Sequence, residues 1–196
     1  SHMQEIAEFP LMLISLVLWH YRIFGDKDYL KATYPKVTKL LDSYKREYEK
    51  ENLLCMLDKW CVVEWPKNFQ HGYDADLTQG KICETAHVSI NAYYLYAIRM
   101  ANVMAKTLGL PAYREEKPLL AAFRKTFYDA ERGLFRDAEN TDHVSLVGNS
   151  FAYGFDLCPD DRCKQNIRRM IDEHGVASLS FFCTFPILMR FAKDGE

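Results

Sequence analysis

The 196-residue sequence carries little net charge, which limits the partners it can have. Its 25 Lys and Arg residues nearly balance 27 Asp and Glu residues, for a formal net charge of −2. A charge this small gives no electrostatic footprint for nucleic acid or for anionic lipid. The sequence therefore predicts neither a nucleic-acid partner nor a membrane partner.

The sequence also lacks metal-binding motifs. Its six cysteines contain no C-x-x-C pair, no Cys and His residues stand at zinc-site spacing, and no D-x-D-x-D-G calcium loop occurs. A chain of this length with 48% hydrophobic residues can build a core without a disulfide framework. We therefore interpret the cysteines as mostly buried free thiols and expect no metal and no cofactor.

The most apolar run, Phe9 to Trp19, is too short to cross a membrane. It has about half of the roughly 20 residues that a spanning helix needs. A buried core helix is the better interpretation.

Residues 1–3 (Ser-His-Met) look like a remnant of an expression vector, and residues 4–196 are interpreted as one partial domain. Any signal peptide would precede these residues, so both a periplasmic or secreted parent and a cytoplasmic parent remain open.

Apolar residues recur at three- and four-residue steps, which predicts an all-α fold of about seven helices. The expected helices are Phe9–Phe24, Asp28–Tyr48, Glu84–Leu108, Pro118–Tyr128, Val144–Leu157, Asp161–Glu173 and a last one from Ser178 or Ser180 to Lys193. Pro35 predicts a kink or a split in the second helix. Short strands are expected between Leu53 and Pro66.

Two long loops, Glu49–Cys83 and Asp129–Asp142, each follow an even-numbered predicted helix. Antiparallel helix pairs place alternate connections at opposite ends of the structure. The two long loops should therefore emerge at the same end. Long loops on a rigid scaffold are where functional residues gather, so a binding site is expected there.

Several short motifs follow one another in a specific order. They are Glu64-Trp65-Pro66, His71-Gly72-Tyr73-Asp74, Glu84-Thr85, Asn91-Ala92-Tyr93-Tyr94, FYDAERGLFRD from Phe127 to Asp137, and HVSLVGNSFAYGFDLCP from His143. Their order and spacing resemble those of the six-hairpin glycosidases, in particular bacterial α-L-rhamnosidases of the glycoside hydrolase family 78 type. The resemblance covers most of the chain.

This resemblance implies part of an (α/α)6 toroid of twelve helices, with short β-hairpins in the long loops. It also implies hydrolysis of terminal rhamnosides with inversion, and a carbohydrate as partner. The family's general-acid Glu lies in an acidic motif before the region matched here, and its proposed base lies in a later W-E loop. Neither motif occurs in this sequence. We therefore expect a fragment of a catalytic domain that is inactive in isolation, and we assign it no catalytic residue.

A sugar site needs flat apolar surfaces and polar groups that bind hydroxyls. The candidate substrate-binding residues are Trp65, Trp60, Glu64, Asp74 and His143. For Trp65, stacking on a sugar and plugging the end of a hairpin remain equally open. For Trp60, burial in the core is favoured, because large aromatic side chains usually pack there.

Two other interpretations remain. One is a non-catalytic carbohydrate-binding or scaffold domain, which would keep the aromatic loops without the carboxylates. The other is an α-solenoid interaction protein, which would have short polar loops and fits the two long loops poorly.

A partial toroid should expose apolar helix faces, and large exposed patches usually bind partners. Self-association through these faces is therefore expected.

Overall fold

A computed structural model describes residues 6–59, 67–69, 71–73 and 85–195. The helices in this part are α1 (Glu8–Phe24), α2 (Lys27–Tyr48), α3 (Val88–Leu108), α4 (Lys117–Phe127), α5 (Leu146–Gly154), α6 (Asp161–His174) and α7 (Phe181–Asp194), with short 3-10 helices η1 (Lys67–Phe69) and η3 (Val176–Ser178). Two antiparallel pairs join β1 (Glu49–Lys50) to β2 (Leu53–Leu54) and β3 (Tyr128–Asp129) to β4 (Leu134–Phe135). The predicted helical fold with short β-hairpins in the long loops is confirmed.

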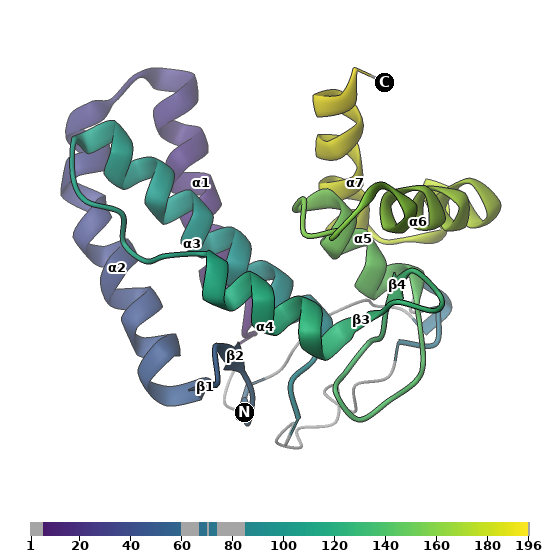
Figure 1. Cartoon of the computed structure of the whole chain (residues 1–196). Coiled ribbons are helices and arrows are strands. Elements are labelled where there is room, and N and C mark those ends of the chain that lie inside the picture. Colours follow the sequence, from purple (N-terminus) through teal and green to yellow (C-terminus); the bar gives the residue numbers. More distant parts are fainter. Residues whose placement is uncertain (1–5, 60–66, 70, 74–84, 196) are drawn as a thin grey trace, which may run out of the picture.

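The helices form two layers (Figure 1). The odd-numbered helices pack in order: α1 lies on α3, α3 on α5, and α5 on α7. The even-numbered helices cover them from one side, since α2 packs on α1 and α3, α4 on α3, and α6 on α5. The result is an arc of helical hairpins whose inner layer consists of α1, α3, α5 and α7.

The burial pattern follows from this layering. Helix α3 is buried on most of its circumference, and α5 is buried along nearly its whole length. The outer helices bury a single stripe each, such as Leu119, Phe123 and Phe127 in α4. A helix packed on several sides is apolar all round, whereas a covering helix needs one apolar face only.

Short polar side chains cap three of the described helices. Asp26 accepts a hydrogen bond from the backbone N–H of Tyr29 at the start of α2. Asp160 does the same for Cys163 at the start of α6, and the Ser180 hydroxyl caps α7. Each cap satisfies an N–H group that has no partner inside the helix.

Two details of the predicted helices differ from the structure. Helix α2 is not split at Pro35 but continues through it, so of the two alternatives a kink stays a prediction. Pro35 and Lys31, whose carbonyl loses its partner, are both exposed, so water can satisfy that carbonyl. Helix α3 begins at Val88, four residues after the predicted start. His87 forms a β-bridge with Ala138, and this extended pairing keeps the helix from starting earlier.

The described cysteines are free thiols. Cys158, Cys163 and Cys183 are buried and Cys55 is half-buried, as the sequence predicts, while Cys61 and Cys83 lie outside the described residues. Within the described ranges, no helix has the length and apolar character needed to cross a membrane.

Two buried asparagines make the same set of hydrogen bonds in two successive hairpins. Asn91 in α3 accepts from the N–H of Leu54 at 2.7 Å and donates to the carbonyl of the same residue at 3.0 Å and to that of His87 at 2.9 Å. Asn149 in α5 repeats this pattern with Phe135 (2.9 Å for both bonds) and Ser145 (2.8 Å). Each asparagine thus ties the second strand of a hairpin to the first turn of the next inner helix.

Replacing either asparagine with alanine should destabilise the chain strongly. In Asn149→Ala, the N–H and C=O of Phe135 lose their side-chain partner in a buried setting. We expect a loss of about 2–4 kcal/mol in the free energy of unfolding, measured by urea denaturation. The control is Asn166→Ala, which removes an exposed hydrogen bond to the carbonyl of Arg132 and should cost about 0.5 kcal/mol or less. Equal losses in both variants would contradict the role assigned to Asn149.

Candidate functional site

The three connections that follow even-numbered helices meet at one end of the arc. The N–H of Glu139, between β4 and α5, donates to the carbonyl of Ala86 at 2.9 Å, and the N–H of Val88 donates to the carbonyl of Asp137 at 2.8 Å. His71, in the α2–α3 connection, contacts Ser178, in the α6–α7 connection. This end is called the loop end below. The prediction that both long loops emerge together is confirmed (Figure 1).

A buried aspartate organises the loop end. Asp137 Oδ2 lies 2.6 Å from Nδ1 of His143. Its other oxygen, Oδ1, accepts from the N–H of Ser145 at 3.0 Å and from the Ser145 hydroxyl at 2.7 Å. The Asp137 side chain is 2% exposed, whereas that of His143 is 46% exposed. The carboxylate therefore sits inside the protein and holds an imidazole at the surface.

Opposing effects act on this carboxylate. Burial raises the pKa of Asp137 above its ordinary value, because a charge is costly away from water. The hydrogen bonds from His143 and Ser145 lower that pKa, since they favour the ionised form, but burial is the larger effect.

Two glycines make room for this arrangement. A Cβ atom on Gly148, in the first turn of α5, would lie 3.0 Å from Asp137 Oδ1 and 2.6 Å from Val88 Cγ1. A Cβ atom on Gly72 would lie 2.9 Å from Nε2 of His143. Gly72 also has a φ of +72°, which other residues adopt at a cost. Any larger residue at position 72 would push against the imidazole.

The α2–α3 connection is held to the scaffold by two further histidines. The Tyr73 hydroxyl lies 2.9 Å from Nδ1 of His87, which is completely buried before the first turn of α3. Nε2 of His71 lies 3.0 Å from both the carbonyl and the hydroxyl oxygen of Ser178, and its ring packs edge-on against His174. These contacts place residues 71–73 next to His143.

Comparison with known proteins identifies the architecture. The family described as the bacterial alpha-L-rhamnosidase 6 hairpin glycosidase domain matches residues 2–191. This chain belongs to that family. No curated protein matches the sequence.

Solved structures of rhamnosidases share the fold of this six-hairpin domain. A GH78 family rhamnosidase of Bacillus sp. GL1 matches 98% of this chain with a TM-score of 0.73 and 16% identity. A rhamnosidase from Klebsiella oxytoca with rhamnose bound matches 97% with a TM-score of 0.71 and 12% identity. The α-L-rhamnosidase of Streptomyces avermitilis, complexed with L-rhamnose, matches 91% with a TM-score of 0.65 and 18% identity. This chain spans only 20%, 35% and 16% of the length of these three proteins.

The structure locates only one of the predicted sugar-binding residues of the six-hairpin domain. His143 lies at the loop end, as expected, two residues before the cap of α5. Trp60, Glu64, Trp65 and Asp74 lie outside the described residues. Those four assignments stay predictions.

Sequence reasoning missed the aspartate that holds His143. Asp137 is the last residue of the FYDAERGLFRD motif, and His143 opens the next motif. Their position at adjoining motif ends was the available signal. Within the described ranges, no three His, Cys, Asp or Glu side chains gather in a way that could hold a metal ion.

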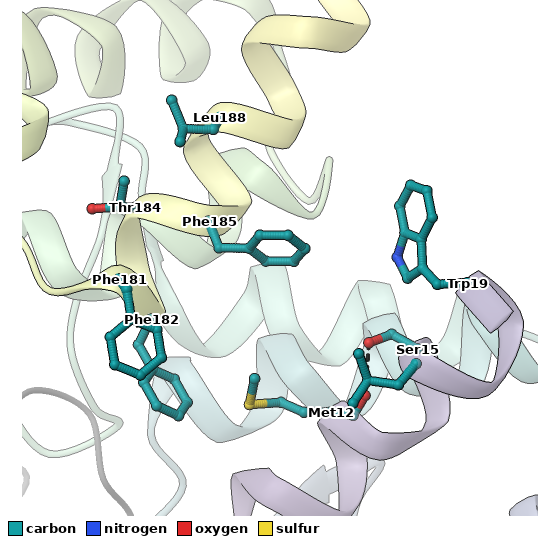
Figure 2. A pocket seen from close by; sticks show the side chains of 9 residues that line it. Met12, Ser15, Trp19, Phe181, Phe182, Thr184, Phe185 and Leu188 are labelled. Carbon is teal, nitrogen blue, oxygen red and sulfur yellow. Dashed lines mark hydrogen bonds between the residues drawn. The ribbon is translucent and has the colours of Figure 1, made fainter. Parts of the chain in front are cut away.

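An apolar groove lies between the two helices at the ends of the inner layer. It has a volume of about 420 Å³ and lies between α1 and α7. Figure 2 shows Trp19 and Met12 of α1 on one side and Phe185 and Leu188 of α7 on the other. Phe9 of α1 stacks on Phe182 of α7 with a centroid distance of 5.5 Å. The two helices therefore touch near one end and leave the groove between them.

Acid should weaken the six-hairpin domain through His87. Burial lowers the pKa of His87 from 6.5 to about 3, so the folded chain leaves it neutral while the unfolded chain protonates it below about pH 6.5. His87 therefore leaves the free energy of unfolding unchanged above about pH 6.5. As the pH falls from there towards 3, it lowers the free energy of unfolding by at most about 1.4 kcal/mol per pH unit.

The measurement is urea denaturation between pH 4 and 7. His87→Gln should show a shallower fall in the free energy of unfolding than the unsubstituted chain, whatever its stability at pH 7. His174→Gln changes an exposed histidine and should keep the steeper slope. The same slope in His87→Gln as in the unsubstituted chain would contradict this account.

Proposed function

We propose that this chain is part of the catalytic domain of a glycoside hydrolase, an α-L-rhamnosidase that cleaves terminal rhamnosides with inversion in the complete polypeptide. The family match over residues 2–191 carries the proposal. Rhamnose is bound in two of the related structures, which supports a carbohydrate ligand. The loop end also supports the proposal, because three connections bring polar side chains together there on a rigid helical scaffold, where binding sites are commonly found.

The proton-transfer groups are proposed to lie elsewhere in that polypeptide. Inverting hydrolysis needs two carboxyl groups roughly 6.5–9.5 Å apart, one as acid and one as base. Asp137 is a carboxylate buried at the described loop end, and His143 and Ser145 already engage both of its oxygens. A carboxylate engaged in this way is a structural anchor. The isolated chain is therefore expected to be inactive.

Within this chain the proposed role is sugar binding. His143 presents a half-exposed imidazole at the loop end. Trp65 and Trp60 are proposed to offer apolar surface to the sugar ring, and Glu64 and Asp74 to bind its hydroxyls. Together these groups would form one wall of the cleft.

The complete polypeptide should hydrolyse 4-nitrophenyl α-L-rhamnoside, and the 196-residue chain should not. Release of nitrophenol from a panel of aryl glycosides measures this directly. Cleavage of another glycoside but not of the rhamnoside would reject the assigned sugar. Binding of rhamnose without hydrolysis of any glycoside would favour the non-catalytic carbohydrate-binding alternative.

We further propose that the chain self-associates through the apolar faces of α1 and α7. The exposed apolar residues repeat the same spacing on both helices. They are Phe9 (46% exposed), Leu13 (56%) and Leu16 (60%) on α1, and Phe181 (75%), Phe185 (48%) and Leu188 (52%) on α7. At about 200 Å² for a large side chain, these six offer about 650 Å². That area approaches the roughly 800 Å² per partner of a standard interface, which favours a second copy of this chain as the occupant.

A charge in this face should separate the copies. The unsubstituted chain is expected to be a dimer by light scattering coupled to size exclusion, and Phe185→Glu is expected to be a monomer with an unchanged circular dichroism spectrum. Leu110→Glu is the control, since Leu110 is similarly exposed (47%) in the α3–α4 connection and should leave the dimer intact. A monomer at all concentrations in the unsubstituted chain would reject self-association and leave the groove to other parts of the polypeptide.

A further inference from the structure

The hydrogen bond between Asp137 and His143 determines which imidazole nitrogen carries the proton. When Asp137 is ionised, its Oδ2 can only accept, so the 2.6 Å contact then requires the proton on Nδ1 of His143. In the neutral ring, Nε2 is then the acceptor. A buried carboxylate that fixes a tautomer in this way controls what the exposed edge of the ring can bind.

The carboxylate is itself fixed from the other side. The N–H and hydroxyl of Ser145, the residue that caps α5, both donate to Asp137 Oδ1. The N–H of Val88 donates to the Asp137 carbonyl at 2.8 Å, which ties the same residue to the start of α3. Asp137 is therefore held at the starts of two inner helices.

The Nε2–Cε1 edge of the imidazole lies against a residue without a side chain. Gly72 approaches Nε2 so closely that a Cβ atom would come within 2.9 Å of it. The His143 side chain nevertheless remains 46% exposed. In the described part of the chain, Nε2 has no hydrogen-bond partner, whereas Nδ1 has one.

We propose that Asp137 is a positioning residue for sugar recognition: it holds His143 in the Nδ1–H tautomer so that Nε2 accepts a hydrogen bond from a sugar hydroxyl. The inference rests on the proposed function only in its choice of ligand class. It assigns a role to a residue that makes no contact with the sugar. It also gives Gly72 a role, because a side chain there would displace the ring from this position.

The first test needs no variant. Long-range ¹H–¹⁵N correlation spectra of the chain at pH 8 should show a ring proton on Nδ1 of His143 and none on Nε2. A proton on Nε2 in the unsubstituted chain would overturn the proposal at once. This measurement also decides the matter if a variant fails to fold.

The second test inverts the tautomer. In Asp137→Asn, the amide oxygen must stay on the Ser145 side to accept its two donors, so the amide NH₂ faces His143 Nδ1. Nδ1 must then accept, and the proton moves to Nε2. Asp142→Asn makes the same chemical change on a side chain that is 94% exposed and should leave the tautomer unchanged. An unchanged tautomer in folded Asp137→Asn would contradict the proposal.

The third test adds the sugar. Titration with L-rhamnose should shift the ¹⁵N resonance of His143 Nε2, and Asp137→Asn should raise the dissociation constant about tenfold, which corresponds to about 1.4 kcal/mol. Asp142→Asn should bind as the unsubstituted chain does. Ser145→Ala, which removes one donor to Asp137, should give a smaller loss than Asp137→Asn.

The outcomes separate this inference from the proposed function. A shift of Nε2 with another monosaccharide but not with rhamnose would reject the assigned sugar and support the role of Asp137. Binding of rhamnose that leaves Nε2 unmoved would reject the role of Asp137 and leave the proposed function standing. If no monosaccharide of the panel moves Nε2, the inference is overturned, whatever the hydrolysis assay shows.

Discussion

The structure depends on two buried asparagine side chains, Asn91 and Asn149, whose amides bond backbone N–H and C=O groups of the short strands. A two-residue strand pair has few ladder hydrogen bonds and is marginal by itself. Asn91 and Asn149 supply both a donor and an acceptor to such a pair and bind the first turn of the following helix as well. An amide is suited to this because it offers both functions from one planar group. The hairpins can therefore stay short while the inner helices keep a fixed relation to them.

The loop end builds on this framework. Once each hairpin is tied to an inner helix, the chain between them can carry polar groups in defined positions. Asp137 follows the second hairpin by two residues and accepts hydrogen bonds from Ser145, the cap residue of α5. Its carboxylate is therefore buried and held in a fixed orientation. His87 occupies the place before α3 that Ser145 takes before α5, and its Nδ1 lies 2.9 Å from the Tyr73 hydroxyl oxygen. The hydrogen bonds to both oxygens of Asp137 give a rigid base for the half-exposed imidazole of His143.

Much of the scaffold was predictable from local rules, and the contacts that complete it were not. The spacing of apolar residues predicted about seven helices, and Asp160 and Ser180, which cap two of them, are residue types that favour helix starts. The start of α3 was misplaced because the competing interaction, the bridge of His87 to Ala138, joins residues far apart in the chain. The pairing of Asp137 with His143 also depends on where two helix starts meet in space. Local periodicity carries no information about such meetings.

The matching asparagine pattern has a consequence for how this fold can vary. The segment between the strand that the asparagine binds (β2 or β4) and the cap of the next helix runs from residue 55 to 86 in the first hairpin and from 136 to 144 in the second. The two segments differ more than threefold in length. Both segments nevertheless begin and end at the same hydrogen-bonded geometry. The hydrogen bonds of Asn91 and Asn149 therefore fix both ends of each segment, so that the segment can change in length without disturbing the helices. The loops at this end can therefore differ in length while the asparagines stay in place.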